Sequence, residues 1–307
     1  MTTAVDPRLE LAGRIARLKE QRKAVILAHN YQLGEVQDIA DFVGDSLELS
    51  RRATQVEAEV LVFCGVMFMA ETAKLLNPQR MVLIPDPLAG CPMCEMAPVE
   101  AVRKRKAELP GVPVVAYVNT TAAVKAEADI CCTSANAIKV VNSLPDTRIL
   151  FLPDRNLGHW VQRHTDKEII LWDGYCPTHQ RITARDVLRL REEHPGATVV
   201  VHPECTPEVI DLADEVLSTG QMMRWARETS ANEIIVGTEV GLIHRLKQEN
   251  PDKTFYPISL LSTCPNMKRI TLEKVAWALE DMQFEVTVPA DIAEKARRAI
   301  ERMLEVA

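Results

Sequence analysis

The sequence predicts an α/β fold with three αβα domains, each built on a small parallel sheet and related by an approximate threefold axis. Three observations predict it. The same series of landmarks recurs three times within 307 residues, and a repeat of this kind indicates one structural unit per copy. Within each copy, apolar β-branched runs alternate with helical patterns, which is typical of parallel sheets covered by helices. Each copy also ends in a Cys-Pro pair.

Each copy opens with a strand-like run that ends in polar residues. The three runs are AVILAHNY at 24–31, VPVVAYVN at 112–119 and ATVVVHPE at 197–204. Aligning them places three residues in one register, at steps of 88 and then 85 residues: His29, Tyr117 and His202. The same steps relate three hydroxyl residues, each shortly after an Ala-Asp pair: Ser46, Ser134 and Thr219.

The second half of each copy contains two further strand-like runs. The first is EVLVFCG, TRILFLPD or NEIIVGTE, and a helical pattern follows it. The second, MVLIPDP, EIILWDG or TFYPISL, leads into the Cys-Pro pair. The three cysteines of these pairs are spaced 85 and then 88 residues apart: Cys91, Cys176 and Cys264.

Helix signals fit the same units. Residues 183–193 begin with Thr183 and Asp186 in a capping-box pattern, and Gly111 and Gly196 lie where a helix should end before the next strand. We therefore expect domains at 1–109, 110–194 and 195–307. The last domain includes a half-repeat from Thr271 with a helix, the strand-like run EVTVP and a final helix.

Composition excludes several classes of protein. With 47% apolar and 26% charged residues, the chain has ample core for two or three globular domains. The net charge of −7 gives no footprint for nucleic acid, and the short basic run 103–106 is typical of a solvated helix face. Residues 1–20 are too charged for a signal peptide, and no apolar run approaches the roughly 20 residues of a membrane span. We expect a cytoplasmic protein.

The polar landmarks lie where a ligand would bind. In open parallel sheets, ligands bind outside the carboxyl ends of the strands, where helix N-termini also present unpaired N–H groups. Three such edges around a threefold axis would face one central site. The sequence contains neither GxGxxG nor GxxxxGK[ST], so no dinucleotide or nucleoside triphosphate is indicated. Any phosphate must be held by Ser, Thr and helix ends.

The eight cysteines are not expected to form disulfides, because the cytoplasm keeps thiols reduced. A free cysteine is usually a small buried residue, but Cys91, Cys176 and Cys264 share one position in all three copies. Three thiolates can hold three corners of a [4Fe-4S] cubane and leave the fourth iron without a protein ligand. Such an iron is a Lewis acid suited to dehydration.

Two other interpretations of these thiols stay open. Zinc could bind the three cysteines together with a histidine such as His179. Alternatively, Cys91 and Cys94 could form a thioredoxin-like pair, although the threefold argument treats Cys94 as a spectator. Cys131 and Cys132 would point to opposite faces of an extended run, so at most one of them could face the site. Cys64 and Cys205 lie at strand ends and are expected to be packing residues.

The sequence resembles the quinolinate synthase family between about residues 28 and 270. The runs that carry the resemblance are HNYQ, DFVGDSLELS, GVMFMAETAKLLNP, AYVNTTA, CTSANA, HPEC, LSTG, GTEVGLIHRL and CPNMKRI. The resemblance implies a pseudo-threefold fold with a [4Fe-4S] cluster at its centre. It also implies a transferase that condenses iminoaspartate with dihydroxyacetone phosphate to quinolinate, phosphate and two waters in NAD biosynthesis. L-aspartate oxidase or aspartate dehydrogenase would then supply the first substrate.

The resemblance also implies roles for individual residues. Glu204 and His202, in HPEC, are the candidates for acid/base chemistry, and the phenols of Tyr31 and Tyr117 can donate or accept protons. The candidates for binding substrate carboxylates and phosphate are His29, Ser46, Asn119, Ser134, His179, Ser218 and Thr219. The run YCPTH around Cys176 departs from the usual family pattern, which leaves the role of His179 open.

Two competing functions are distinguishable from the synthase. A cluster enzyme of the kind that builds diphthamide also resembles a three-domain assembly with one cysteine per domain, but HNYQ, HPEC and CPNM argue against it. A thiol or iron-sulfur redox sensor would use Cys91 and Cys94 as a switch. In that case Cys94→Ser would abolish the response, whereas the synthase would keep its cluster.

Overall fold

A computed structural model describes residues 7–306. The first six residues of the segment judged too charged for a signal peptide lie outside this range. The described chain falls into two compact units. One comprises the residues up to Gly90 together with Pro265–Val288, and the other comprises Cys91–Cys264 together with the residues from Pro289 onward. No helix within the described range is both long and apolar enough to cross a membrane.

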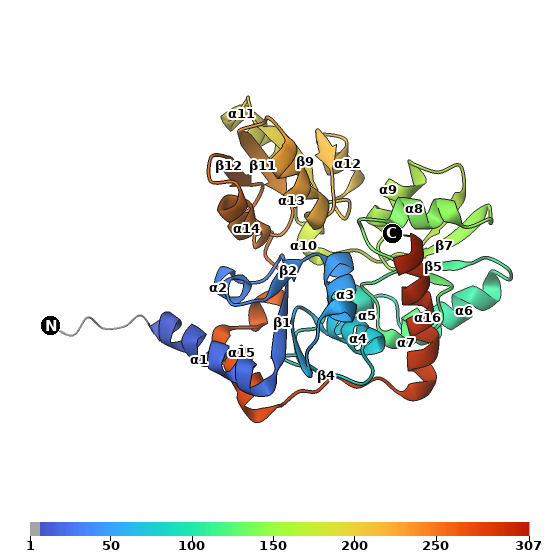
Figure 1. Ribbon diagram of the computed structural model, residues 1–307. Coiled ribbons are helices and arrows are strands. Elements are labelled where there is room, and N and C mark those ends of the chain that lie inside the picture. The colour runs from blue at the N-terminus through green and yellow to red at the C-terminus, as the bar shows by residue number, and fades with distance from the viewer. Residues whose placement is uncertain (1–6, 307) are drawn as a thin grey trace. The chain divides into compact units, whose positions relative to one another are not determined.

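The first unit contains one parallel sheet of four strands in the order β2-β1-β3-β4 (Figure 1). Its strands are β1 (Ala24–His29), β2 (Phe42–Gly44), β3 (Val60–Cys64) and β4 (Met81–Leu83). Its helices are α1 (Pro7–Arg22), α2 (Gly34–Asp38), α3 (Ser46–Gln55), α4 (Met67–Leu76) and α15 (Leu272–Asp281), with a 3₁₀ turn, η1 (Met267–Arg269). Helix α15, from the C-terminal tail, packs against α1 and β3.

The second unit contains two more four-stranded parallel sheets, in the orders β6-β5-β7-β8 and β10-β9-β11-β12. The strands of the first are β5 (Val114–Tyr117), β6 (Ile130–Cys132), β7 (Arg148–Leu152) and β8 (Glu168–Leu171). Those of the second are β9 (Thr198–Val201), β10 (Glu215–Val216), β11 (Glu233–Gly237) and β12 (Thr254–Pro257). All three sheets therefore share one topology, which confirms the α/β class and the three small parallel sheets.

Helices precede or follow most strands of the second unit. They are α5 (Pro92–Glu95), α6 (Val99–Glu108), α7 (Ala122–Lys125), α8 (Ala137–Ser143), α9 (Arg155–Gln162), α10 (Pro177–Gln180), α11 (Ala184–Glu193), α12 (Pro207–Ile210), α13 (Thr219–Glu228), α14 (Leu242–Glu249) and α16 (Ala290–Val306). The predicted capping box of α11 is confirmed, because Thr183 caps the helix and Asp186 bonds back to it. Gly111 takes the positive φ of 78° that glycine adopts without a steric penalty.

Hydrogen bonds reproduce the predicted repeat register atom by atom. In each sheet, an aspartate carboxylate accepts a 2.7 Å bond from an amide of the first strand, and its own amide donates back to the carbonyl of the same strand residue. The three pairs are Asp41 with Ile26, Asp129 with Val114, and Asp214 with Val199. These aspartates belong to the Ala-Asp pairs of the sequence pattern.

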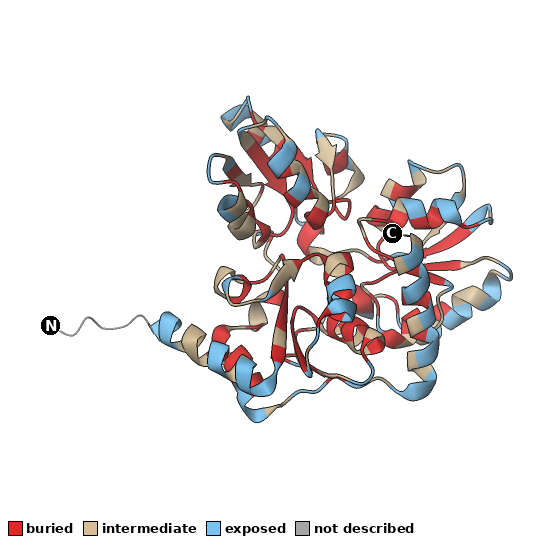
Figure 2. Ribbon diagram, viewed as in Figure 1, coloured by how far each residue is buried: buried red, intermediate tan, exposed pale blue. Residues whose placement is uncertain are grey.

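Most residues of the strands are buried (Figure 2). β3 and β5 are buried along their whole length, as expected for strands of parallel sheets covered on both faces. One buried cluster of the second unit joins β9 and β11 to the helices beside them, with Val199, Val201, Ile235, Val187 and Leu190 among its members. These rigid sheets fix where the polar strand ends lie.

The C-terminal tail differs from the half-repeat prediction. The run EVTVP does not form a strand, and Glu285 makes only an isolated antiparallel bridge to Leu83. The physical reason is that Val286 alone is buried in this run, while Pro289 has no N–H with which to extend a ladder. The flanking helices α15 and α16 form as predicted. The three domain boundaries stay a prediction.

Candidate active site

The three register-equivalent cysteines differ in exposure from the other five. Cys91, Cys176 and Cys264 are partly exposed, whereas Cys64, Cys94, Cys131, Cys132 and Cys205 are buried. None of the eight belongs to a disulfide. The partly exposed cysteines are the ones that the repeat pattern singles out as candidate ligands.

Burial raises the pKa of three other cysteines and so disfavours their thiolate form. It raises the pKa of Cys131 to about 12 and also raises the pKa of Cys64 and Cys205. The thiolate is the reactive and metal-binding form. Cys64 and Cys205, which were predicted to be packing residues, are both buried.

The cysteine loops are attached to the sheets in the same way in each repeat. The amide just after the third strand donates a bond of 2.8–3.0 Å to the carbonyl two residues before the cysteine. The donor and acceptor pairs are Met67 and Ala89, Arg155 and Gly174, and Val240 and Ser262. The backbone thus presents all three cysteines from equivalent positions.

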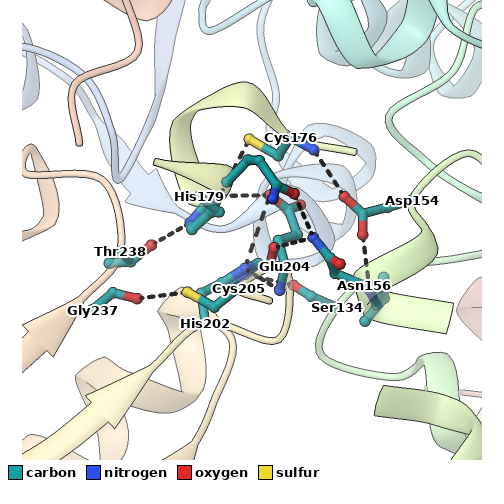
Figure 3. A network of polar contacts seen from close by, with 12 residues as sticks. Ser134, Asp154, Asn156, Cys176, His179, His202, Glu204, Cys205, Gly237 and Thr238 are labelled. Atoms are coloured by element: carbon teal, nitrogen blue, oxygen red, sulfur yellow. Dashed lines mark hydrogen bonds and ion pairs between the residues drawn. The ribbon is translucent and has the colours of Figure 1, made fainter. Parts of the chain in front are cut away.

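Cys176 lies in a polar cluster with His179 and Glu204 (Figure 3). The Nδ1 atom of His179 is 3.2 Å from the Cys176 Sγ and 2.8 Å from a Glu204 carboxylate oxygen. One ligand atom from each residue lies within 4.8 Å of the others. The group therefore has the chemistry and geometry to hold a metal ion.

The pKa values of Cys176 and Cys91 are both raised. Burial and the charge of Glu204 raise the pKa of Cys176 well above its ordinary value. For Cys91, a hydrogen bond with Cys94 followed by burial raises the pKa. A coordinated metal reverses this balance, because a coordinating thiol is deprotonated outright.

Glu204 follows β9 and is 4% exposed. The phenol of Tyr117, the last residue of β5, donates a 2.5 Å hydrogen bond to the Oε1 atom of Glu204. Burial alone would raise the pKa of this carboxyl, but the charges of His179 and His202 and hydrogen bonds from His179 and Tyr117 outweigh it. The pKa of Glu204 is held below its usual range, so the side chain is a carboxylate at neutral pH.

His202 is oriented by its neighbours. Its Nδ1 atom accepts the amide of Glu204 at 3.3 Å, and its Nε2 atom is 3.2 Å from the hydroxyl of Ser134. The ring stacks on His179, with 4.7 Å between centroids. Because Nδ1 accepts the amide of Glu204, Nε2 is the ring nitrogen that can donate a hydrogen bond to an oxygen.

The same backbone arrangement occurs at the equivalent position of the first unit. His29 accepts the amide of Tyr31 on Nδ1 at 3.1 Å, and the two rings meet edge to face. Ser46 is the first residue of α3, directly after the capping residue Asp45. The predicted roles of His29, Tyr31 and Ser46 stay predictions.

The remaining predicted residues lie in the second unit. Ser218 caps α13 in a capping box with Gln221, and Thr219 begins that helix. Within the described chain, Asn119 has a buried side-chain oxygen that no protein group hydrogen-bonds. An acceptor of this kind is suited to a donor on a bound molecule.

Three residues that contact the polar group of Cys176, His179 and Glu204 were not identified from the sequence. Thr238 bonds to the Nε2 atom of His179 at 2.8 Å, and Asn156 donates to the carbonyl of Glu204 at 3.1 Å. A carboxylate oxygen of Asp154 accepts the amide of Cys176 at 3.1 Å. All three residues follow β7 or β11, so their place at the carboxyl ends of strands was the available signal.

Comparison with known proteins decides the family. The family described as "Quinolinate synthetase A protein" matches residues 13–305. The chain is 58% identical to the quinolinate synthase of Dehalococcoides mccartyi (strain CBDB1), over 96% of this chain and 98% of that protein. It is 54% identical to the quinolinate synthase of Methanoregula boonei, over 98% and 99%. The chain belongs to the quinolinate synthase family.

A further member of the quinolinate synthase family, from Thermodesulfovibrio yellowstonii, is 57% identical over 94% of this chain and 96% of its own length. All three repeats and all three candidate cysteines lie inside the matched region. The family membership implied by motifs such as HNYQ and HPEC is therefore confirmed.

Proposed function

We propose that this chain is a transferase that condenses iminoaspartate with dihydroxyacetone phosphate to give quinolinate, phosphate and two waters. Membership of the quinolinate synthase family supports the proposal, since the relatives named above carry that name. One observation carries it: of eight cysteines, only the three in equivalent repeat positions are partly exposed. We further propose a cytoplasmic role in NAD biosynthesis, with L-aspartate oxidase or aspartate dehydrogenase as supplier.

A [4Fe-4S] cluster fits the donor set of Cys91, Cys176 and Cys264. Three thiols can occupy three corners of a cubane, and the buried cysteines are not needed as ligands. When bound, such a cluster supplies an iron without a protein ligand, which can act as a Lewis acid on a substrate hydroxyl or carboxylate.

Glu204 is our candidate for proton transfer. Its low pKa makes it an acceptor rather than an acid at neutral pH, and Tyr117 and His179 hold its two oxygens from different directions. A base fixed in this manner needs little reorganisation when a proton arrives. Tyr117 can return a proton, because its phenol already shares one with the carboxylate.

Hydrogen-bonding groups near Glu204 suit an anionic substrate. His202 directs its Nε2 atom to Ser134, and both groups can rotate or exchange a partner to bind a carboxylate or phosphate oxygen. Asn119 offers its unpartnered oxygen to a donor such as an imine or hydroxyl. We retain Ser218, Thr219, His29, Tyr31 and Ser46 as proposed substrate contacts.

A second candidate is a site for a single ion such as zinc. It is favoured by the close approach of ligand atoms of Cys176, His179 and Glu204, all within 4.8 Å. Cysteine sulfur, histidine nitrogen and glutamate oxygen are each zinc ligands in proteins. In that case Glu204 would be a ligand, and acid-labile sulfide would be absent.

Metal and sulfide analysis separates the two candidates. Protein purified without oxygen should contain about four iron and four sulfide per chain if the cluster is present. The same preparation should form quinolinate from freshly generated iminoaspartate and dihydroxyacetone phosphate. Zinc at about one equivalent without sulfide, or a full cluster without quinolinate formation, would contradict the proposal.

A further inference from the structure

Two buried acids occupy equivalent positions in the second and third repeats. Asp154 follows β7 and Glu239 follows β11, and each side chain is 0% exposed. They lie 85 residues apart, the same step that relates Tyr117 to His202 and Ser134 to Thr219 in these two repeats.

Each acid connects the start of a helical segment to a candidate ligand cysteine. Asp154 accepts the amide of Leu157 on Oδ1 at 2.8 Å and the amide of Cys176 on Oδ2 at 3.1 Å (Figure 3). Glu239 accepts the amide of Gly241 on Oε2 at 2.7 Å and the amide of Cys264 on Oε1 at 2.9 Å. In both cases one carboxyl oxygen accepts the amide of the cysteine, and the other accepts an amide of the segment just after the strand.

The first repeat shows that the fold does not require these acids. Val66 occupies the equivalent position there, and it is apolar and buried. The backbone bond between Met67 and Ala89 still forms, so the loop before the cysteine closes without a carboxylate. Burying a polar carboxyl group is costly, and a cost that the first repeat avoids indicates a purpose beyond closing the loop.

We infer that Asp154 and Glu239 are positioning residues that fix the backbone at Cys176 and Cys264, and so hold these two thiols in place for the cluster. The inference rests on the proposed function, in which both cysteines are cluster ligands. Each carboxyl group accepts two backbone amides at once, so it joins the start of a helical segment to the cysteine. It therefore restrains the amide of the residue whose sulfur must bind iron.

Asp154 bonds the amide of Cys176, and Glu239 bonds the amide of Cys264. A variant of one acid can therefore serve as the control for the other. Asp154→Asn and Glu239→Gln keep the size of each side chain but replace one acceptor oxygen with an NH₂ group. That group would face a backbone N–H, so each variant loses one of its two bonds. Thr183→Ala is the matched control, because it removes the cap of α11 without touching a cysteine.

Hydrogen exchange and iron release measure the effect directly in anaerobically prepared protein. We expect exchange in peptides with Cys176 to rise by about threefold to tenfold in Asp154→Asn, the scale of one lost hydrogen bond, while exchange at Cys264 is unchanged. Glu239→Gln should show the converse. Both variants should release iron to a chelator faster than wild type, and Thr183→Ala should match wild type in exchange at both cysteines and in iron release.

The outcomes separate this inference from the proposed function. A wild-type protein without a cluster would contradict the proposed function, and the exchange arm would still decide the role of the two acids. Wild-type exchange rates and wild-type iron release in both variants would overturn the inference alone. If one variant does not fold, the other decides, because the two sites lie in different repeats.

Discussion

The phenol of Tyr117 donates a hydrogen bond to the carboxylate of Glu204 across 87 residues of sequence. The bond joins the end of β5 to the segment after β9, so two sheets with the same topology contribute to one buried pair. His179 bonds to the other carboxylate oxygen of Glu204 at 2.8 Å. The carboxylate is thereby fixed and kept ionised, which is the state that a proton acceptor requires.

Replacing Glu204 should impair chemistry while leaving the protein intact. In Glu204→Gln, we expect the fold and the iron content to persist and turnover to fall by about 10²–10⁴-fold, the usual scale for a lost acid/base group. Steady-state quinolinate formation, compared with circular dichroism and iron analysis of the same sample, measures this. Tyr117→Phe keeps the carboxylate and should lose less activity. Near-normal turnover in Glu204→Gln would mean that another group moves the proton.

The cysteines should divide into two classes on substitution. Cys91→Ser, Cys176→Ser and Cys264→Ser should each abolish or severely reduce the cluster, because three thiolates hold it. Cys94→Ser and Cys205→Ser are the matched controls and should keep full iron and sulfide. Full cluster content in the first three variants would refute the ligand assignment, and loss of a redox response in Cys94→Ser would favour the sensor.

Gly174 is predicted to be irreplaceable at the entrance of the Cys176 loop. A Cβ atom at this position would lie 2.4 Å from the backbone carbonyl of Pro153, whereas one at Gly90 would meet nothing within 4 Å. Gly174→Ala should therefore displace the loop and lower both thermal stability and iron content, and Gly90→Ala should change neither. Equal iron content and melting temperature in the two variants would show that the loop adjusts without loss.

Asp86 gives a pH-dependent prediction for the first unit. It binds Lys274 at 2.7 Å and Arg269 at 3.3 Å, which connects the segment after β4 to the C-terminal tail. Burial raises the pKa of Asp86, but the hydrogen bonds from Lys274 and Leu88 and the nearby charges outweigh it and lower the pKa below its ordinary 3.8. The stabilisation is therefore present above pH 3.8 and is lost as pH falls toward the folded-state pKa.

Urea unfolding of Asp86→Asn tests this sign. We expect the variant to be less stable by about 1–2 kcal/mol at neutral pH, because both cations are partly exposed and the gain is screened. The difference from wild type should shrink as pH falls below about 3.8. A difference that grows toward acid pH would contradict the assignment.

Much of the fold was predictable because its repeats are marked by residues with fixed structural tasks. Asp41, Asp129 and Asp214 each form the same pair of reciprocal hydrogen bonds with the first strand of their sheet. Such a pair requires a fixed number of residues between the strand and the aspartate, and this spacing is what the sequence pattern detects. The run EVTVP was misread because its alternation resembles a strand, while its pairing depends on tertiary contacts with β4 that no local pattern encodes.

The candidate site was predictable only in part for a related reason. His202 and Glu204 belong to a recognisable motif, and Cys176 belongs to the repeat. Thr238 and Asn156 contribute to the site through hydrogen bonds to His179 and to the Glu204 carbonyl, and a threonine or asparagine after a strand is too common to stand out. Ser218 was identified correctly as a residue at a strand end, but its hydroxyl accepts an amide of α13 as a helix cap.

Titration of the anaerobic protein with quinolinate, followed by the absorption and resonance spectra of the cluster, tests the central claim most directly. If Cys91, Cys176 and Cys264 are its only protein ligands, the product should perturb the spectrum at saturation. An analogue lacking one carboxylate should do so at higher concentration, because it forms fewer hydrogen bonds to anion-binding groups. A spectrum indifferent to quinolinate, with the cluster intact, would mean that a protein group occupies the fourth iron, and would contradict the account.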